Sequence, residues 1–139
     1  IAELEKAVQA APEFLKASAE QDLGVVKAIA IIWRTTRNAM IYLKLRKQMF
    51  EDEAAGRTEQ ALDTLQHIKA ILQEEMAAAE VFHRLVAADS RLGFEAAQQY
   101  FYRPLDILEN LIGLHQILKE QIPVFEQKLK SGVQLPGGA

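Results

Sequence analysis

Residues 58–88 read TEQALDTLQHIKAILQEEMAAAEVFHRLVAA, and this stretch decides the fold class. Its apolar residues recur every three or four positions, which is the spacing that places side chains on one face of an α-helix. Thr58 stands where an N-cap is expected. The expected apolar stripe consists of Leu62, Leu65, Ile68, Leu72, Met76, Ala79, Phe82 and Val86. The sequence therefore predicts one long amphipathic helix over residues 58–88.

The segment before it predicts a second long helix, from an N-cap at Asp22 to about Ala55, with Gly56 as the stop. Its apolar stripe consists of Val25, Val26, Ile29, Ile32, Trp33, Met40, Leu43 and Phe50. Three further residues widen the stripe beyond one face: Ile31, Ile41 and Leu45. We therefore expect this helix to be central, with neighbours on two sides, and we expect Trp33 to be largely buried.

Both ends of the chain also follow a helical pattern. Residues 2–19 predict a shorter helix that Pro12 should kink or split, because proline lacks an amide donor and clashes with the preceding turn. A last helix should begin at Pro104, be kinked or divided at Pro123, and end at Gly132. Its stripe consists of Leu105, Leu108, Leu111, Ile112, Leu118, Ile122, Phe125 and Leu129.

Strand signals are missing, since no β-branched run alternates with polar residues and no Asn-Gly or Asp-Gly turn occurs. The predicted fold is all-α: an up-and-down bundle of three long helices plus a shorter N-terminal helix. Residues 1–132 are expected to form one domain and residues 133–139 a flexible tail. Because residue 1 is isoleucine and the helical pattern starts at once, we expect a piece of a longer protein. Processing of an ordinary N-terminus is the alternative.

Composition limits the classes of function. The formal charge of −3 is too small to imply a strongly charged partner, and the chain has no cysteine for thiol or disulfide chemistry. A chain without cysteine is stable in oxidising and reducing compartments alike, so the compartment stays unknown. The longest apolar run, residues 28–33, is too short for a transmembrane helix, and no signal peptide is recognisable. We therefore expect no membrane partner.

Histidines and carboxylates do not form a convincing metal site. Di-iron bundles use two Glu-x-x-His pairs on separate helices, and only Glu80 and His83 make such a pair here. His83 is expected at the edge of the core, His115 as a hydrogen-bonded core residue on the last helix, and His67 in solvent. No metal and no cofactor are therefore predicted.

A basic stretch on the second helix is the one candidate for nucleic-acid binding, which requires clustered positive charge. It consists of Arg34, Arg37, Lys44, Arg46 and Lys47. Three acidic residues, 51–53, follow at once, and the chain is acidic overall. A solvated helix face is the better interpretation, and no nucleic-acid partner is expected.

The irregular segment 88–103 holds the candidate ligand or interdomain residues. They are Asp89, Arg91, Glu95, Tyr100 and Tyr102. Loops often carry binding groups, and carboxylates with tyrosine rings suit a sugar surface. The alternative is a plain helix connection whose aromatic residues fill the bundle end. In either case, we expect a neighbouring carboxylate to hold Arg91, while Leu92 and Phe94 pin the segment to the bundle.

The strings DSRLGFEA (89–96) and YFY (100–102) resemble a segment near the end of large bacterial proteins of the glycosidase type. Those proteins are similar to α-glucuronidases in plan, with a catalytic barrel followed by a C-terminal helical region. The similarity covers about residues 58–120. The family's catalytic carboxylates belong to the barrel, so no catalytic residue is carried over to this chain.

The resemblance implies a non-catalytic helical module that supports or completes a carbohydrate-active barrel of the parent chain. Its partners would be that barrel and a carbohydrate, and a second copy if the module mediates dimerisation. The alternative is a stand-alone helical protein-interaction or dimerisation module that uses an exposed apolar stripe. A metal-binding bundle enzyme is a third, weaker hypothesis, because its ligand set is incomplete.

Overall fold

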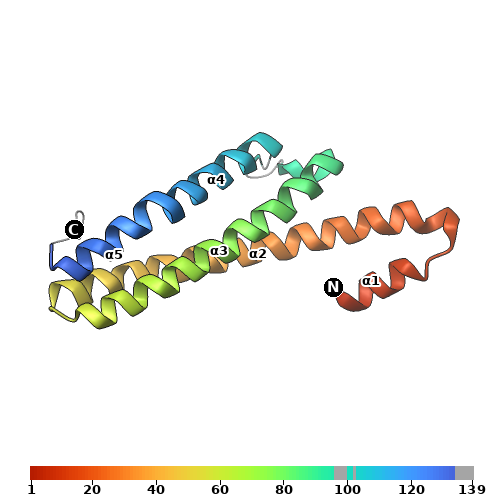
Figure 1. Ribbon diagram of the computed structural model, residues 1–139. Helices are drawn as coiled ribbons and strands as arrows, with labels where there is room; N and C mark the ends of the chain where they lie inside the picture. The colour runs from red at the N-terminus through yellow and green to blue at the C-terminus, as the bar shows by residue number, and fades with distance from the viewer. Residues whose placement is uncertain (96–99, 102, 134–139) are drawn as a thin grey trace.

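The computed structural model describes residues 1–95, 100–101 and 103–133. The fold class is all-α, as predicted (Figure 1). The described α-helices are α1 (Ala2–Gln9), α2 (Glu13–Ala54), α3 (Thr58–Ala88), α4 (Pro104–Gln116) and α5 (Ile122–Ser131). None of the helices in these ranges is both long and apolar enough to cross a membrane.

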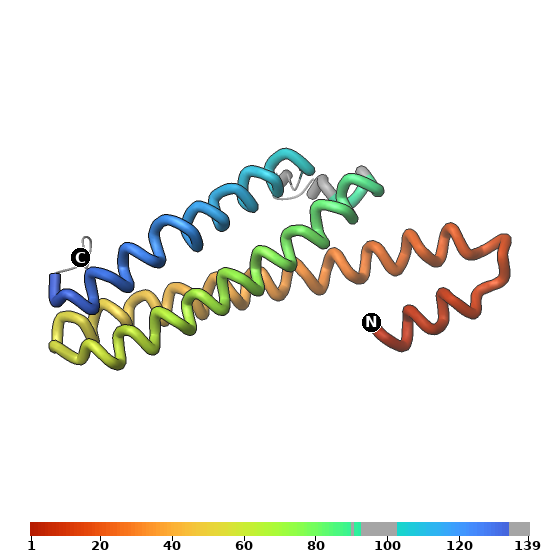
Figure 2. The backbone as a smooth tube through the Cα atoms, viewed as in Figure 1, coloured from red at the N-terminus to blue at the C-terminus, as the bar shows by residue number. Residues whose placement is uncertain are grey.

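The bundle is elongated, and α3 is its central helix. Figure 2 shows α3 running back along α2, with α4 and α5 returning along α3 in the opposite direction. The short α1 folds back beside the N-terminal part of α2. The prediction that the second helix is central is therefore wrong, because α3 contacts α2 as well as α4 and α5, although α2 does have two neighbours, α3 and α1.

Pro12 separates the first two helices, as predicted. It is the N-cap of α2, where its missing amide donor costs no helical hydrogen bond. The predicted helix start at Asp22 is wrong, because α2 runs without interruption from Glu13. Residues 13–24 contain no proline, and Gly24 is tolerated inside a helix at a modest energetic cost.

A tight turn joins α2 to α3. Gly56 adopts a φ of 71°, the left-handed conformation that glycine tolerates best, and it ends α2 as predicted. Asp52 is buried and accepts a 2.8 Å hydrogen bond from Nε of Arg57. Arg57, rather than the predicted Thr58, occupies the N-cap position of α3. The carboxylate thus ties the end of one helix to the start of the next.

The C-terminal arm is divided just before Pro123, as predicted. A π-helical turn, Ile117–Gln121, links α4 to α5 just before this proline. The wider turn accommodates the residue that cannot donate a backbone hydrogen bond. The predictions that Pro104 begins this arm and that Gly132 ends it are confirmed, the latter with a φ of 68°.

The core has two parts, both built on α3. One lies toward the α2–α3 turn and consists of Met49, Ala61, Leu65, Ile68, Leu72, Leu114, Ile122 and Leu129. The other lies toward the opposite end and consists of Ala28, Ile31, Ala78, Ala79, Phe82, Val86 and Ile107. The predicted stripe of α3 is confirmed, with Leu62 and Met76 half-buried at its margins.

The predicted core face of α2 is wrong in large part: Ile32 and Phe50 pack half-buried against the core, but most of the other large residues of the stripe are exposed. The residues that α2 buries are Ala28, Ile31, Asn38, Met49 and Asp52. Trp33 is 72% exposed, so it does not belong to the core of the single chain. The stripe of the last helix is wrong in part, because Ile107 and Leu114 are buried while Leu105 and Ile112 are exposed. Both α2 and the C-terminal arm (α4 and α5) pack one side onto α3 and leave an apolar side exposed.

Candidate interaction site

The end of α3 is organised by Asp89 and Arg91. Asp89 is the C-cap of α3, and its carboxylate accepts hydrogen bonds from Nη2 of Arg91 at 2.6 Å and from the Arg91 backbone amide at 3.0 Å. The Arg91 hydrogen bond holds the pKa of the Asp89 carboxyl below its ordinary value. The expectation that a carboxylate holds Arg91 is confirmed, and Leu92 packs against the core as expected.

The rest of this segment brings two of the other candidates side by side. A 3-10 turn, Ser90–Gly93, leads into the strands β1 (Phe94–Glu95) and β2 (Tyr100–Phe101). They pair antiparallel, with Glu95 opposite Tyr100 and Phe94 opposite Phe101. This minimal ladder lies in a connection that the sequence indicated to be irregular. Tyr102 lies outside the described residues, so the structure does not place it.

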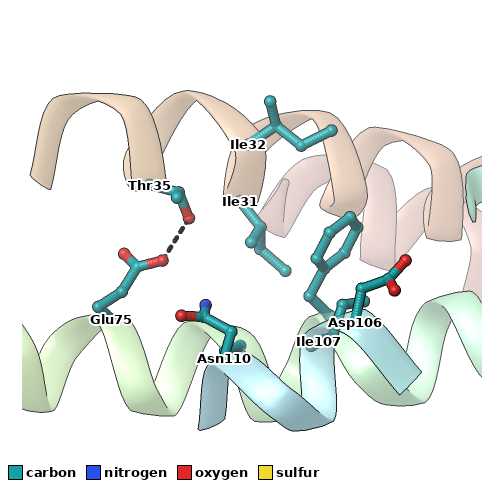
Figure 3. Close-up of a pocket in the computed structure, with 9 residues that line it drawn as sticks. Ile31, Ile32, Thr35, Glu75, Asp106, Ile107 and Asn110 are labelled. Carbon is teal, nitrogen blue, oxygen red and sulfur yellow. Dashed lines mark hydrogen bonds between the residues drawn. The ribbon is translucent and has the colours of Figure 1, made fainter. Parts of the chain in front are cut away.

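A groove of about 280 Å³ opens on one side of the bundle, above α3 and between α2 and α4. Its lining residues are Ile31, Ile32, Thr35, Glu75, Ala79, Phe82, Asp106, Ile107 and Asn110. Figure 3 shows apolar side chains between the two carboxylates, Glu75 and Asp106, which lie at opposite ends. The groove lies at the lower limit for a small-molecule pocket.

The carboxylate of Glu75 is held by two donors from α2. Oγ1 of Thr35 donates to Oε1 at 2.7 Å, and the side-chain amide of Asn38 donates to Oε2 at 3.1 Å (Figure 3 shows the Thr35 bond). Asn38 is only 1% exposed, and its Oδ1 has no hydrogen-bond partner in the described structure. Nothing in the sequence analysis singled out this polar cluster. Polar residues at positions 35 and 38, on the same side of the helix as Ile31, were the available signal.

The second carboxylate of the groove is also engaged. Asp106 accepts hydrogen bonds from the backbone amide of Arg103 at 3.1 Å and from its guanidinium at 3.0 Å. The side-chain hydrogen bond from Arg103 lowers the pKa of Asp106. A general acid needs a raised pKa, so Asp106 is poorly suited to protonate a leaving group. This arrangement caps α4 and does not form a catalytic acid pair.

The histidines do not assemble a metal site with the carboxylates. Within the described ranges, no group of three or more His, Cys, Asp or Glu residues is placed to hold a metal ion. His83 is half-buried at the core edge and His67 is exposed, both as expected. The expectation for His115 is wrong: it is exposed, because α4 turns the Leu114 side toward α3.

Large apolar side chains are exposed on the outer face of α2, which we define as Val26, Ile29, Trp33, Met40 and Leu43. Trp33 is 72%, Met40 69% and Leu43 61% exposed. The residues of the basic stretch, 34, 37, 44, 46 and 47, are exposed, as expected, with Arg37 3.6 Å from Glu74. The stripe is recognisable in the sequence, but it was wrongly predicted to face the core, because α2 carries apolar residues on nearly all sides.

Comparisons with protein-family models, with curated proteins and with solved structures find no match to this chain. Functional inference therefore depends on the surfaces of the chain itself. The segment at Asp89, the groove at Glu75 and the outer face of α2 are the three candidates. In the first two, the carboxylates of Asp89, Glu75 and Asp106 accept hydrogen bonds from other residues of the chain. The outer face of α2 exposes large apolar side chains, among them Trp33, Met40 and Leu43.

Proposed function

We propose that this chain is a non-catalytic helical interaction module, and that it binds another protein through the outer face of α2. The observation that carries the proposal is the exposure of Trp33, Met40 and Leu43 on one side of a single helix. Isolated exposed apolar residues are normal on a protein surface. A continuous stripe of large ones is typical of an interaction surface.

Burial of this face by a partner would be favourable in free energy. Full burial of one Ile, Leu or Met side chain contributes about 1.5–3 kcal/mol. Ile29, Met40 and Leu43 together with the indole of Trp33 would therefore supply a substantial part of a protein–protein binding energy. Tryptophan is also enriched among binding hot spots, which cluster near the centre of an interface. A helix laid along α2 has the shape to cover all of them at once.

A narrower proposal follows from the resemblance to proteins of the glycosidase type. In it, the partner is the catalytic barrel of a parent chain, and the segment around Asp89 and Glu95 lies near a carbohydrate. This proposal rests on the resemblance of residues 89–102 alone. The Asp89–Arg91 ion pair supports the plainer interpretation, because two of the groups that would face a sugar are bonded to each other at the end of α3.

Site-specific photo-cross-linking tests the interaction module. A photoreactive amino acid replaces Met40 on the outer face, and in a matched control it replaces Gln66, which is exposed on α3. Both variants are produced in full-length form in the native cells. We expect a discrete cross-linked product from position 40 and not from position 66. The absence of a product at position 40, or equal products at both positions, would contradict the proposal.

A further inference from the structure

The outer face of α2 has the spacing of a coiled-coil seam. Its residues, with Thr36 completing the series, fall at positions 26, 29, 33, 36, 40 and 43, so the steps alternate between three and four. In heptad terms, residues 26, 33 and 40 are a positions and residues 29, 36 and 43 are d positions. Continuing the same steps places Asp22 at the d position before this series and Lys47 at the a position after it.

We propose that the partner of this face is a second copy of the chain, packed antiparallel along α2. The inference rests on the proposed function, for which it names the partner. In an antiparallel pair of helices, each a position faces a d position of the other copy. In the register proposed here, the facing pairs are Trp33 with Thr36, Met40 with Ile29, and Val26 with Leu43. The largest side chain thus meets the smallest one in the seam.

Charge complementarity selects this register. It places Lys47 of each copy opposite Asp22 of the other copy. The dimer would therefore have one Lys–Asp contact at each end of the seam. A shift of one heptad in either direction would instead place Lys47 against Leu15 or Ile29. A parallel, in-register pair would oppose Lys47 to Lys47 and Asp22 to Asp22. The shifted registers bury Lys47 against an apolar residue, and the parallel pair brings like charges together, and both weaken association.

The positions beside the seam contain no like-charge contact in the same register. Arg37 faces Ala30 of the other copy, and Lys44 faces Leu23. Farther out, Glu51 of one copy lies beside Lys16 of the other, which is a favourable pair. Flanking charges are the features that commonly set the orientation of paired helices.

The bundle leaves this side of α2 accessible. The buried side of α2, with Ile31 and Asn38, faces α3, and the outer face lies on the opposite side of the helix. The short α1 packs along the flank that carries Lys27, where Nζ of Lys27 lies 2.6 Å from Oε1 of Glu5. Two copies can therefore meet along α2 with each α3 on the outside.

A charge-reversal cycle, measured by sedimentation equilibrium of the full chain, tests the register. Lys47→Glu or Asp22→Lys alone makes both end contacts repulsive and should weaken dimerisation on the order of tenfold. The double variant D22K/K47E restores opposite charges and should return the dissociation constant to within about threefold of the original. Lys119→Glu, an equal change in net charge at an exposed position far from the seam in sequence, should have no effect.

Cross-linking tests the orientation independently. The chain has no cysteine, so Val26→Cys and Leu43→Cys each introduce a single thiol. With a short bis-maleimide, a mixture of the two variants should give a linked dimer that neither variant gives alone. The only tryptophan, Trp33, should show an emission maximum that moves to shorter wavelength as the concentration rises through the dimerisation range. Circular dichroism of each variant confirms that it is folded.

Three outcomes would overturn the antiparallel dimer: a chain that stays monomeric at high micromolar concentration, a dimer indifferent to the charge cycle, or each cysteine variant linking to itself. A monomer that still forms a specific cross-link from position 40 to a different protein overturns the dimer and leaves the interaction module intact. A monomer with no product from position 40 overturns both.

Discussion

The side-chain amide of Asn38 donates a 3.1 Å hydrogen bond to Oε2 of Glu75, across the interface between α2 and α3. Thr35 donates to the other oxygen of the same carboxylate at 2.7 Å. This polar cluster lies between the two parts of the apolar core, where sliding one helix along the other would leave its groups unpaired. We infer that it fixes the register of α2 on α3, in the way that single polar residues fix register in coiled coils.

Removing the acceptor should therefore destabilise the bundle. Glu75→Ala leaves the buried amide of Asn38 without its partner, and we expect a loss of about 1–3 kcal/mol in the free energy of unfolding. The adjacent Glu74→Ala is the control, because the contacts of Glu74 are longer, 3.9 Å to Arg34 and 3.6 Å to Arg37. It should change stability by less than about 0.5 kcal/mol. Urea unfolding of both variants gives the comparison, and equal effects would argue against a register role.

Trp33 should contribute little to the stability of the single chain. Because its side chain is largely exposed, Trp33→Ser should change the free energy of unfolding by less than about 1 kcal/mol. Phe82→Ala, on the buried face of α3, should cost about 3–5 kcal/mol. Unfolding is followed by circular dichroism at concentrations low enough for the chain to be monomeric. A large loss for Trp33→Ser under those conditions would mean that Trp33 packs within the single chain.

The chain should not hydrolyse glycosides. That reaction requires two carboxyl groups across a substrate cleft, one of them protonated. Glu75 is bonded to Thr35 and Asn38, and Asp106 is bonded to Arg103, which lowers its pKa. A panel of aryl-glucuronides and aryl-glucosides should show no turnover above buffer. Turnover that Glu75→Gln or Asp106→Asn abolishes would show that the groove is catalytic.

Particular residues explain which parts of the fold could be predicted. The pattern of α3 is one-sided, so Leu65, Ile68 and Phe82 were placed correctly from spacing alone. The pattern of α2 is apolar on nearly all sides, so spacing could not decide whether the Ile31 side or the Trp33 side faces the core. Packing decides that, and it depends on the partner helix. This is the physical reason that α3 was predicted well and α2 was not.

The contacts at the candidate sites could also be predicted only in part, depending on whether they join residues near in sequence. Asp89 and Arg91 are two residues apart, so their ion pair depends on local geometry and could be expected from the sequence. The contacts of Glu75 join residues about forty positions apart, with 40 between Glu75 and Thr35 and 37 between Glu75 and Asn38. These contacts could not be predicted before the pairing of α2 with α3 was known. The outer face of α2 became a candidate only because the folded chain leaves it uncovered.

The pair of Asp89 and Arg91 gives a prediction on pH dependence. Arg91→Ala removes the hydrogen bonds and the positive charge that hold the pKa of Asp89 low, so this pKa should rise toward the ordinary value of an aspartate, about 3.9. The matched control is Arg84→Ala, which removes an exposed arginine from α3. A carbon-13 NMR titration of the Asp89 carboxyl in the chain and in both variants measures the effect directly.

The sign of the effect on stability follows from that direction. A carboxyl whose pKa is lower in the folded chain than in the unfolded chain stabilises the fold above the unfolded pKa, and this contribution is lost as the pH falls through the folded pKa. The stability difference between the original chain and Arg91→Ala should therefore be larger at pH 7 than at pH 2. Because Arg91 is engaged in ending α3, cross-linking from position 40 should not change. An unaltered Asp89 titration, together with lost cross-linking, would instead assign Arg91 to the partner.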